Sequence, residues 1–127
     1  MKYKMYCIFA KESLDKLNGV RGKLATQAGH AYLHAFWDAT AHDASYLENV
    51  QAIEYMKSDH AYKITLVVDT VEELLELEKE YEGKCGTSLV TDAGFTVFKE
   101  PTTTCLGLGP ISEEIIGESL KRLKTLT

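Results

Sequence analysis

Runs of β-branched and aromatic residues alternate along this chain with longer segments in which apolar residues recur at helical spacing. The first kind of run is typical of strands, and the second is typical of helices that bury one face. The alternation therefore predicts an α/β fold, with a four-stranded mixed β-sheet flanked by helices on both faces. The expected order of elements is β-α-α-β-α-β-β-α.

The individual elements follow from these runs and from the turn residues between them. Strands are expected at residues 3–10, 62–68, 87–91 and 103–107. Residues 11–21 are expected to form a loop, and helices are expected from Gly22, over 45–57, over 70–82 and after Pro110. Small residues would let the first helix approach the sheet closely, namely Ala25, Ala28, Gly29 and Ala31.

Two of these helices carry end signals. Thr70 and Glu73 have the spacing of a capping box, in which each side chain accepts a hydrogen bond from a free backbone N–H. Gly83 is expected to end that helix. The last helix is expected to have Ser112 as its N-cap and to bury four apolar side chains, namely Ile115, Ile116, Leu120 and Leu123.

Size and cysteine content limit the class of protein. A chain of 127 residues with 45% apolar positions predicts a single domain over residues 1–127. The apolar stretch near the N-terminus ends at Lys11, so neither a signal peptide nor a membrane span is expected. Three cysteines, without a C-x-x-C pair, favour a reducing, cytoplasmic location over a disulfide framework or a zinc site.

Charge is distributed unevenly along the chain, whose net charge is −5. Residues 1–23 hold six cations and two anions, a net charge of +4, whereas the remaining residues carry −9. A basic face is enough to bind phosphate groups, even on an acidic protein. The same lysines could equally be ordinary solvated residues beside a strand.

A polar stripe runs along the first expected helix. Lys23, Gln27, His30 and His34 follow one another at intervals of four, three and four residues, which places them along one side. Such a stripe could be a catalytic surface, but it is more often the solvent face of an amphipathic helix. His30 could also be a core histidine that is satisfied by a backbone carbonyl.

Further candidates lie at the ends of the later strands. Asp92 follows the third strand, where open α/β sheets often place functional groups, although it could be a turn aspartate. Thr104 could be no more than a good strand residue. Gly107-Leu108-Gly109 could approach a phosphate, but a lone Gly-x-Gly is more often a turn.

Two common hydrolytic chemistries find no support in the sequence. Cys7 falls within a buried strand, and no serine lies in a Gly-x-Ser-x-Gly elbow, which argues against a covalent acyl-enzyme. The histidines form no His-Glu-x-x-His pattern, which argues against metal-assisted hydrolysis.

Two motifs resemble those of a known family. Gly22-Lys-Leu-Ala-Thr-Gln-Ala-Gly-His-Ala31 resembles a Gly-Lys-x-Ala-x-Gln-x-x-His-Ala opening, and Thr91-Asp-Ala-Gly94 with Thr104-Cys-Leu-Gly-Leu-Gly-Pro110 resembles an Asp-Ala-Gly to Thr-x-Leu-Gly-x-Gly-Pro block. Both belong to the archaeal and eukaryotic type of peptidyl-tRNA hydrolase, the second family of these enzymes. The strand and Glu-rich helix over residues 63–77 also resemble that family.

The resemblance implies hydrolysis of the ester between a peptide and the terminal ribose of tRNA, without a metal or an organic cofactor. It implies the catalytic residues Lys23, Gln27, Asp92 and Thr104, and the substrate-binding residues His30, Gly94, Gly107 and Gly109. Asp92 would orient or deprotonate water, and Lys23 would stabilise negative charge on the carbonyl oxygen or a nearby phosphate. Relatives often form homodimers, and neither DNA nor a membrane is an expected partner.

The chain also departs from the family pattern. Phe95-Thr96-Val97 stands where the family usually has Arg-Thr-Gln, Pro101-Thr102 only loosely represents its Pro-Gly, and residues 38–60 lack its usual pattern. These departures allow a divergent member that acts on a different acylated substrate. A catalytically silent module that binds tRNA or protein on the same fold is an alternative, because fold resemblance does not exclude it. Composition and strand order alone would also allow a small regulatory domain that binds a metabolite. A hydrolase requires Lys23, Asp92 and Thr104 around one open cleft, whereas a silent module tolerates their separation or burial.

Overall fold

The computed structural model describes residues 2–58 and 60–127 of the chain. Its elements are β1 (Tyr3–Ala10), α1 (Lys11–Leu14), η1 (Asp15–Leu17), α2 (Arg21–Ala41), α3 (Leu47–Lys57), β2 (Lys63–Val68), α4 (Val71–Tyr81), β3 (Thr87–Asp92), β4 (Thr102–Ser112), α5 (Glu118–Lys121) and β5 (Lys124–Thr125). The predicted order is confirmed from β1 to β4, except that short helical turns replace the loop expected over residues 11–21. Within the described residues, every helix is too short or too polar to cross a membrane.

The sheet has five strands in the order β3-β4-β1-β2-β5, where four were predicted. β1 and β2 are parallel, and the other neighbours are antiparallel, so the predicted mixed character is confirmed. The fifth strand is the pair Lys124 and Thr125, which adds to the outer edge of β2. The prediction missed this strand because two exposed residues carry no detectable alternation.

The prediction of a long C-terminal helix after Pro110 is wrong. β4 continues through Ile111 and Ser112, which pair with β1, and Ser112 accepts a hydrogen bond from the Glu114 N–H in a turn instead of capping a helix. Only α5, four residues long, is helical there. Ile116, Leu120 and Leu123 still pack against the core, so their apolar character reflected burial and not a continuous helix.

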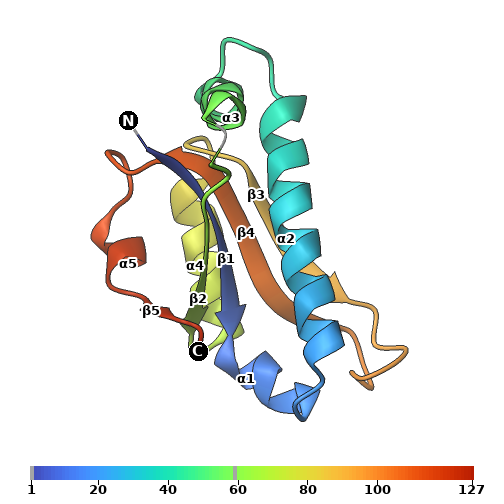
Figure 1. Ribbon diagram of the computed structural model, residues 1–127. Helices are drawn as coiled ribbons and strands as arrows, with labels where there is room; N and C mark the ends of the chain where they lie inside the picture. The colour runs from blue at the N-terminus through green and yellow to red at the C-terminus, as the bar shows by residue number, and fades with distance from the viewer. Residues whose placement is uncertain (1, 59) are drawn as a thin grey trace.

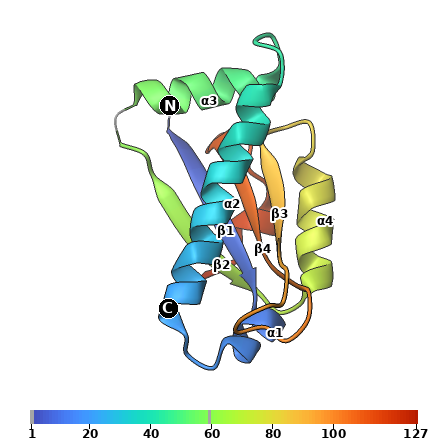
Figure 2. The ribbon, with the colours of Figure 1, turned by 90° about the vertical axis from the view of Figure 1, so that its right-hand side faces the viewer.

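Helices cover both faces of the sheet, as predicted, and β1 divides the core between them. Tyr6, Ile8 and Ala10 face a cluster that includes α4 and α5, whereas Cys7 and Phe9 face α2. The side chains alternate because successive residues of a strand point to opposite faces. Figures 1 and 2 show α2 running along one side of the sheet and α4 along the other.

The close approach of α2 to the sheet, expected from its small residues, is confirmed at Ala31 but not at Ala25 or Gly29, which are exposed. At Gly107 of β4, an added Cβ would lie 2.6 Å from the carbonyl carbon of Ala31 and closer still to its oxygen. Gly86 makes a similar approach to α2. These glycines set the distance between α2 and the sheet, and so they position the side chains that α2 presents.

The N-terminus of α4 provides a stability test. Thr70 accepts a hydrogen bond from the Glu73 N–H at 3.3 Å, which confirms half of the predicted capping box; the Glu73 carboxylate contacts the Thr70 hydroxyl and not its N–H. We expect Thr70→Ala to lower the free energy of unfolding by about 1 kcal/mol in urea denaturation. Thr70→Ser should restore most of this loss, and equal stability of all three proteins would contradict a capping role.

Candidate active site

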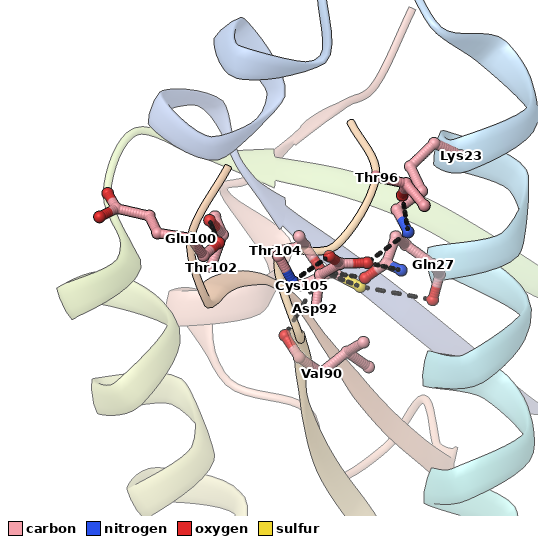
Figure 3. Close-up of polar contacts among 10 residues, drawn as sticks. Lys23, Gln27, Val90, Asp92, Thr96, Glu100, Thr102, Thr104 and Cys105 are labelled. Carbon is pink, nitrogen blue, oxygen red and sulfur yellow. Dashed lines mark hydrogen bonds and ion pairs between the residues drawn. The ribbon is translucent and has the colours of Figure 1, made fainter. Parts of the chain in front are cut away.

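Side chains from three separate elements meet at one end of the sheet. Lys23 and Gln27 come from the first turns of α2, Asp92 ends β3, and Thr104 lies near the start of β4 (Figure 3). β3 and β4 are paired antiparallel strands, so the end of one lies beside the start of the other. The four residues predicted as catalytic are thus brought together, although they are up to 81 positions apart in the sequence.

Asp92 is the centre of this cluster. Its Oδ2 forms an ion pair with the Lys23 ammonium and accepts a hydrogen bond from Gln27 Nε2 at 3.3 Å, while Oδ1 accepts one from the Gly94 N–H at 2.8 Å. The Asp92 side chain is only 8% exposed. The Lys23 hydrogen bond outweighs the opposing effect of burial and lowers the pKa of Asp92, with further contributions from the Gly94 N–H and the charge of His30. Asp92 is therefore an anion at neutral pH.

A buried chain of hydrogen bonds from Thr104 through Gln27 fixes the position of the Asp92 carboxylate. The Thr104 hydroxyl donates to Gln27 Oε1 at 2.7 Å, which leaves the Gln27 amide nitrogen to donate to Asp92. Gln27 and Thr104 are 3% and 2% exposed, so the amide has little freedom to reorient. Lys23 is therefore the most exposed of the four side chains, and Asp92, Gln27 and Thr104 are buried beneath it.

Lys23 lies at the surface of the cluster, with its side chain 20% exposed. Its ammonium also contacts the Thr96 hydroxyl at 3.3 Å, which connects α2 to the loop that follows β3. Gly94 in this loop has φ +85°, and an added Cβ would lie 2.7 Å from Glu100 Cα. Glycine is therefore required there, where the backbone turns to present its N–H to Asp92.

The predicted polar stripe of α2 is divided between two environments. Gln27 is buried against the strands, so the solvent-face interpretation is wrong for this residue. His30 and His34 are exposed, which agrees with a solvent face and excludes a core role for His30. The division arises because Gln27 shares the buried side of α2 with Ala31, Ala35 and Ala39, whereas the two histidines lie on its exposed side.

Gly107 and Gly109 do not join the cluster. Both are buried inside β4, so the turn expected at Gly107-Leu108-Gly109 is wrong. Gly107 is paired with Cys7 and Ser88, and the Gly109 N–H donates to the carbonyl of Gly86, near the opposite end of β3 from Asp92. Close packing explains why glycine occupies both positions. A Cβ at Gly107 would meet the backbone of Ala31 in α2, and a Cβ at Gly109 would meet the backbone of β1.

Some contacts of the cluster could not be anticipated from the sequence. Thr96 is an exposed loop threonine without a distinguishing pattern, and the Cys105 thiol contacts the Gln27 carbonyl at 3.6 Å. Cys7, placed by sequence in a buried strand, is buried in β1. A hydrogen bond with Cys105 and burial raise the pKa of Cys7, so it is not a thiolate nucleophile.

The basic N-terminal segment is divided between the two ends of β1. Lys4 lies away from the cluster and pairs with Glu113 at 2.6 Å. Lys11, Lys16 and Arg21 follow the other end of β1, in α1, η1 and the start of α2. Figure 1 shows these elements at the same end of the molecule as the loop between β3 and β4. Part of the predicted basic surface therefore lies beside the cluster.

Comparisons with known proteins agree on one family. The family model described as Peptidyl-tRNA hydrolase PTH2 matches residues 3–126. Among relatives named peptidyl-tRNA hydrolase, one from Methanopyrus kandleri is 40% identical over 76% of this chain and 78% of its own length. One from Methanococcus maripaludis is 38% identical over 84% and 87%, and one from Thermococcus sibiricus is 33% identical over 97% of both.

Proposed function

The chain belongs to the PTH2 family of peptidyl-tRNA hydrolases, and on this basis we propose that the cluster around Asp92 is its catalytic centre. The protein is a hydrolase that cleaves the ester between a peptide and tRNA. The observation that carries the site assignment is the ion pair between the partly exposed Lys23 and the buried Asp92, supported by Gln27 and Thr104. Residues 1–127 are proposed to form one such domain.

Hydrolysis needs a water molecule to attack the ester carbonyl carbon. A new C–O bond forms as the water loses a proton, and negative charge moves to the carbonyl oxygen. The bond between the carbonyl carbon and the ribose oxygen then breaks, and the ribose oxygen takes up a proton that balances the one lost by the water. The Asp92 carboxylate can accept a hydrogen bond from the attacking water and so orient it. Its lowered pKa makes it a better orienting group than a proton store. The Lys23 ammonium can stabilise the charge on the carbonyl oxygen.

Gln27 and Thr104 act through Asp92 in this proposal. Both are too buried to touch a macromolecular substrate directly. Thr104 fixes the direction of the Gln27 amide, and that amide fixes one carboxylate oxygen of Asp92. They are therefore positioning residues, which refines the catalytic role that the sequence implied for them.

The assay that tests this function is release of an N-blocked, labelled amino acid from tRNA by the purified protein. We expect multiple turnovers by the wild type. Binding of the tRNA without release would favour the silent-module alternative, for which the described contacts offer no specific support. Lys23, Asp92 and Thr104 converge, which supports a hydrolase. Asp92 and Thr104 are also buried, which a silent module tolerates, so the release assay decides between the two.

Salt dependence tests the proposed role of the cations beside the site. If two or three phosphates are neutralised, raising monovalent salt from about 50 to 200 mM should weaken substrate binding by roughly ten- to fortyfold. Arg21→Gln and Lys16→Gln should each reduce the slope of log KM against log salt. Lys2→Gln, at the other end of β1, is the matched control and should leave the slope unchanged. Salt-independent KM values would contradict phosphate recognition by this surface.

The cellular location and the oligomeric state of the protein are also proposals. All three cysteines are free and buried, which is compatible with the proposed cytoplasmic location. The homodimer is implied only by the family resemblance and stays a prediction. Light scattering of the purified protein over a concentration series would measure its mass and decide it.

A further inference from the structure

Three aromatic rings are stacked along the outer flank of α2. The centroids of the His30 and His34 rings are 5.5 Å apart, and those of His34 and Trp37 are 5.2 Å apart. The planes within each pair are inclined by only 26° and 24°. We call His30, His34 and Trp37 the ring column.

The ring column is exposed. Trp37 is 56% accessible, and both histidines are exposed as well. Tryptophan is the largest apolar side chain, and burial would stabilise the folded chain. Trp37 is not an isolated exposed residue, because its ring is stacked on that of His34. Contiguous exposed patches, unlike single residues, are typical of binding surfaces.

The ring column begins at the catalytic centre. His30 follows Gln27 by three positions, so the column begins about one turn beyond Gln27, on the exposed side of α2. The charge of His30 contributes to the lowered pKa of Asp92, which places His30 within electrostatic reach of that carboxylate. From His30, the column extends along α2 for about 10 Å, at 1.5 Å per residue.

We propose that the ring column binds the unpaired 3′ end of tRNA by stacking with its bases, an inference that rests on the proposed function. The ester to be cleaved is at the last nucleotide of this single strand, so the strand must lead away from Lys23 and Asp92. Proteins that hold single-stranded nucleic acid use aromatic side chains as stacking platforms beside cationic groups.

The chemistry of the ring column fits bases better than it fits the peptide part of the substrate. An apolar peptide side chain is recognised by a concave apolar pocket, whereas this surface is the convex flank of a helix. Two of its three rings are imidazoles, whose nitrogens can also hydrogen-bond with bases or phosphates. Stacking tolerates any base, which suits an enzyme that must accept many tRNAs.

Trp37 is the only tryptophan in the chain, so the intrinsic fluorescence of the protein reports directly on the ring column. The probe is a deacylated tRNA with its complete 3′ end, titrated into the wild-type protein. The control probe is the same tRNA without its last three nucleotides. We expect saturable quenching by the complete tRNA and little quenching by the shortened one, because only a base in contact with the indole quenches it strongly.

Kinetics of two variants separate stacking from simple packing. Trp37→Ala should raise KM for blocked aminoacyl-tRNA about tenfold at nearly constant kcat, since loss of one stacked base weakens binding by about this factor or more. Trp37→Phe should recover most of the affinity. Leu75→Ala is the matched control, because Leu75 is 47% exposed on α4, on the opposite face of the sheet, and KM should not change.

The outcomes distinguish this proposal from the proposed function. Turnover by the wild type with no quenching, and with an unchanged KM in Trp37→Ala, would overturn the ring column and leave the hydrolase intact. Equal quenching by both tRNAs would also overturn it, since the contact would then lie outside the 3′ end. Quenching specific to the complete tRNA in a protein without turnover would support the ring column and remove the catalytic assignment.

Discussion

Asp92→Asn is expected to lower kcat/KM for blocked aminoacyl-tRNA by about 10³-fold, the middle of the range for a group that acts on the attacking water. The carboxylate accepts from three donors, namely the Lys23 ammonium, the Gln27 amide and the Gly94 N–H. An asparagine side chain has one acceptor oxygen and one donor nitrogen. At least one of the three donors would therefore face another donor, and the negative charge opposite Lys23 would be lost.

A matched control is available one residue away. Thr91 is exposed, and its hydroxyl contacts that of Thr103 at 3.0 Å, outside the catalytic cluster. Thr91→Val is therefore expected to keep kcat/KM within about threefold of the wild type, as is usual for surface changes of this size. Circular dichroism should show that both variants are folded. Turnover near the wild-type rate by folded Asp92→Asn would remove Asp92 from the chemistry.

The same residue gives an expectation for pH. The pKa of Asp92 is lowered below its usual 3.8, first by the Lys23 hydrogen bond. Because the folded pKa is below the unfolded one, the ion pair stabilises the folded protein above the usual carboxyl pKa, and this stabilisation is lost as pH falls through the lowered value. Any loss of activity caused by protonation of Asp92 should therefore have its midpoint below pH 3.8.

Gly107→Ala is expected to cause the largest loss of stability, about 3 kcal/mol in urea denaturation, at the upper end for overpacking of a core. The added methyl group would overlap the backbone of Ala31, which cannot move aside as a flexible side chain can. α2 would have to shift away from β4. Since α2 carries Lys23 and Gln27, activity should fall as well, even under conditions where the variant stays folded.

Gly29→Ala provides the comparison on the same helix. An added Cβ at Gly29 would meet nothing within 4 Å. We expect this variant to be more stable than the wild type by roughly 0.5–1 kcal/mol, because alanine is the better helix former. If Gly107→Ala were as stable as the wild type, the contact between β4 and α2 would be looser than the structure indicates.

Much of the proposed site could be named from the sequence, because its residues belong to two motifs that resemble those of a known family, whereas spacing alone left each of them only a candidate. Lys23 and Gln27 lie four positions apart on one helix, and Asp92 directly follows an apolar strand. Helical spacing and strand ends are short-range properties that can be detected within a local window of the sequence. Which of these groups reach the surface is a different matter, since it depends on how far α2 is rotated against the sheet. Gln27 and His30 illustrate this, because one is buried and the other exposed although both belonged to the predicted stripe.

The C-terminal region marks the limit of prediction from local pattern. Ile111 and Ser112 follow a proline and precede two glutamates, which is typical of a helix start, yet they pair with the first residues of β1, the central strand. Pairing with a strand over a hundred residues away leaves no trace in a local window, and tertiary contacts override local propensity. The sequence by itself determined the α/β class, and the resemblance of its motifs indicated the family and the residues that we propose as catalytic. Only the tertiary structure decided the fifth strand, the burial of Gln27 and Thr104, and the ring column beside the site, because each depends on contacts between distant segments.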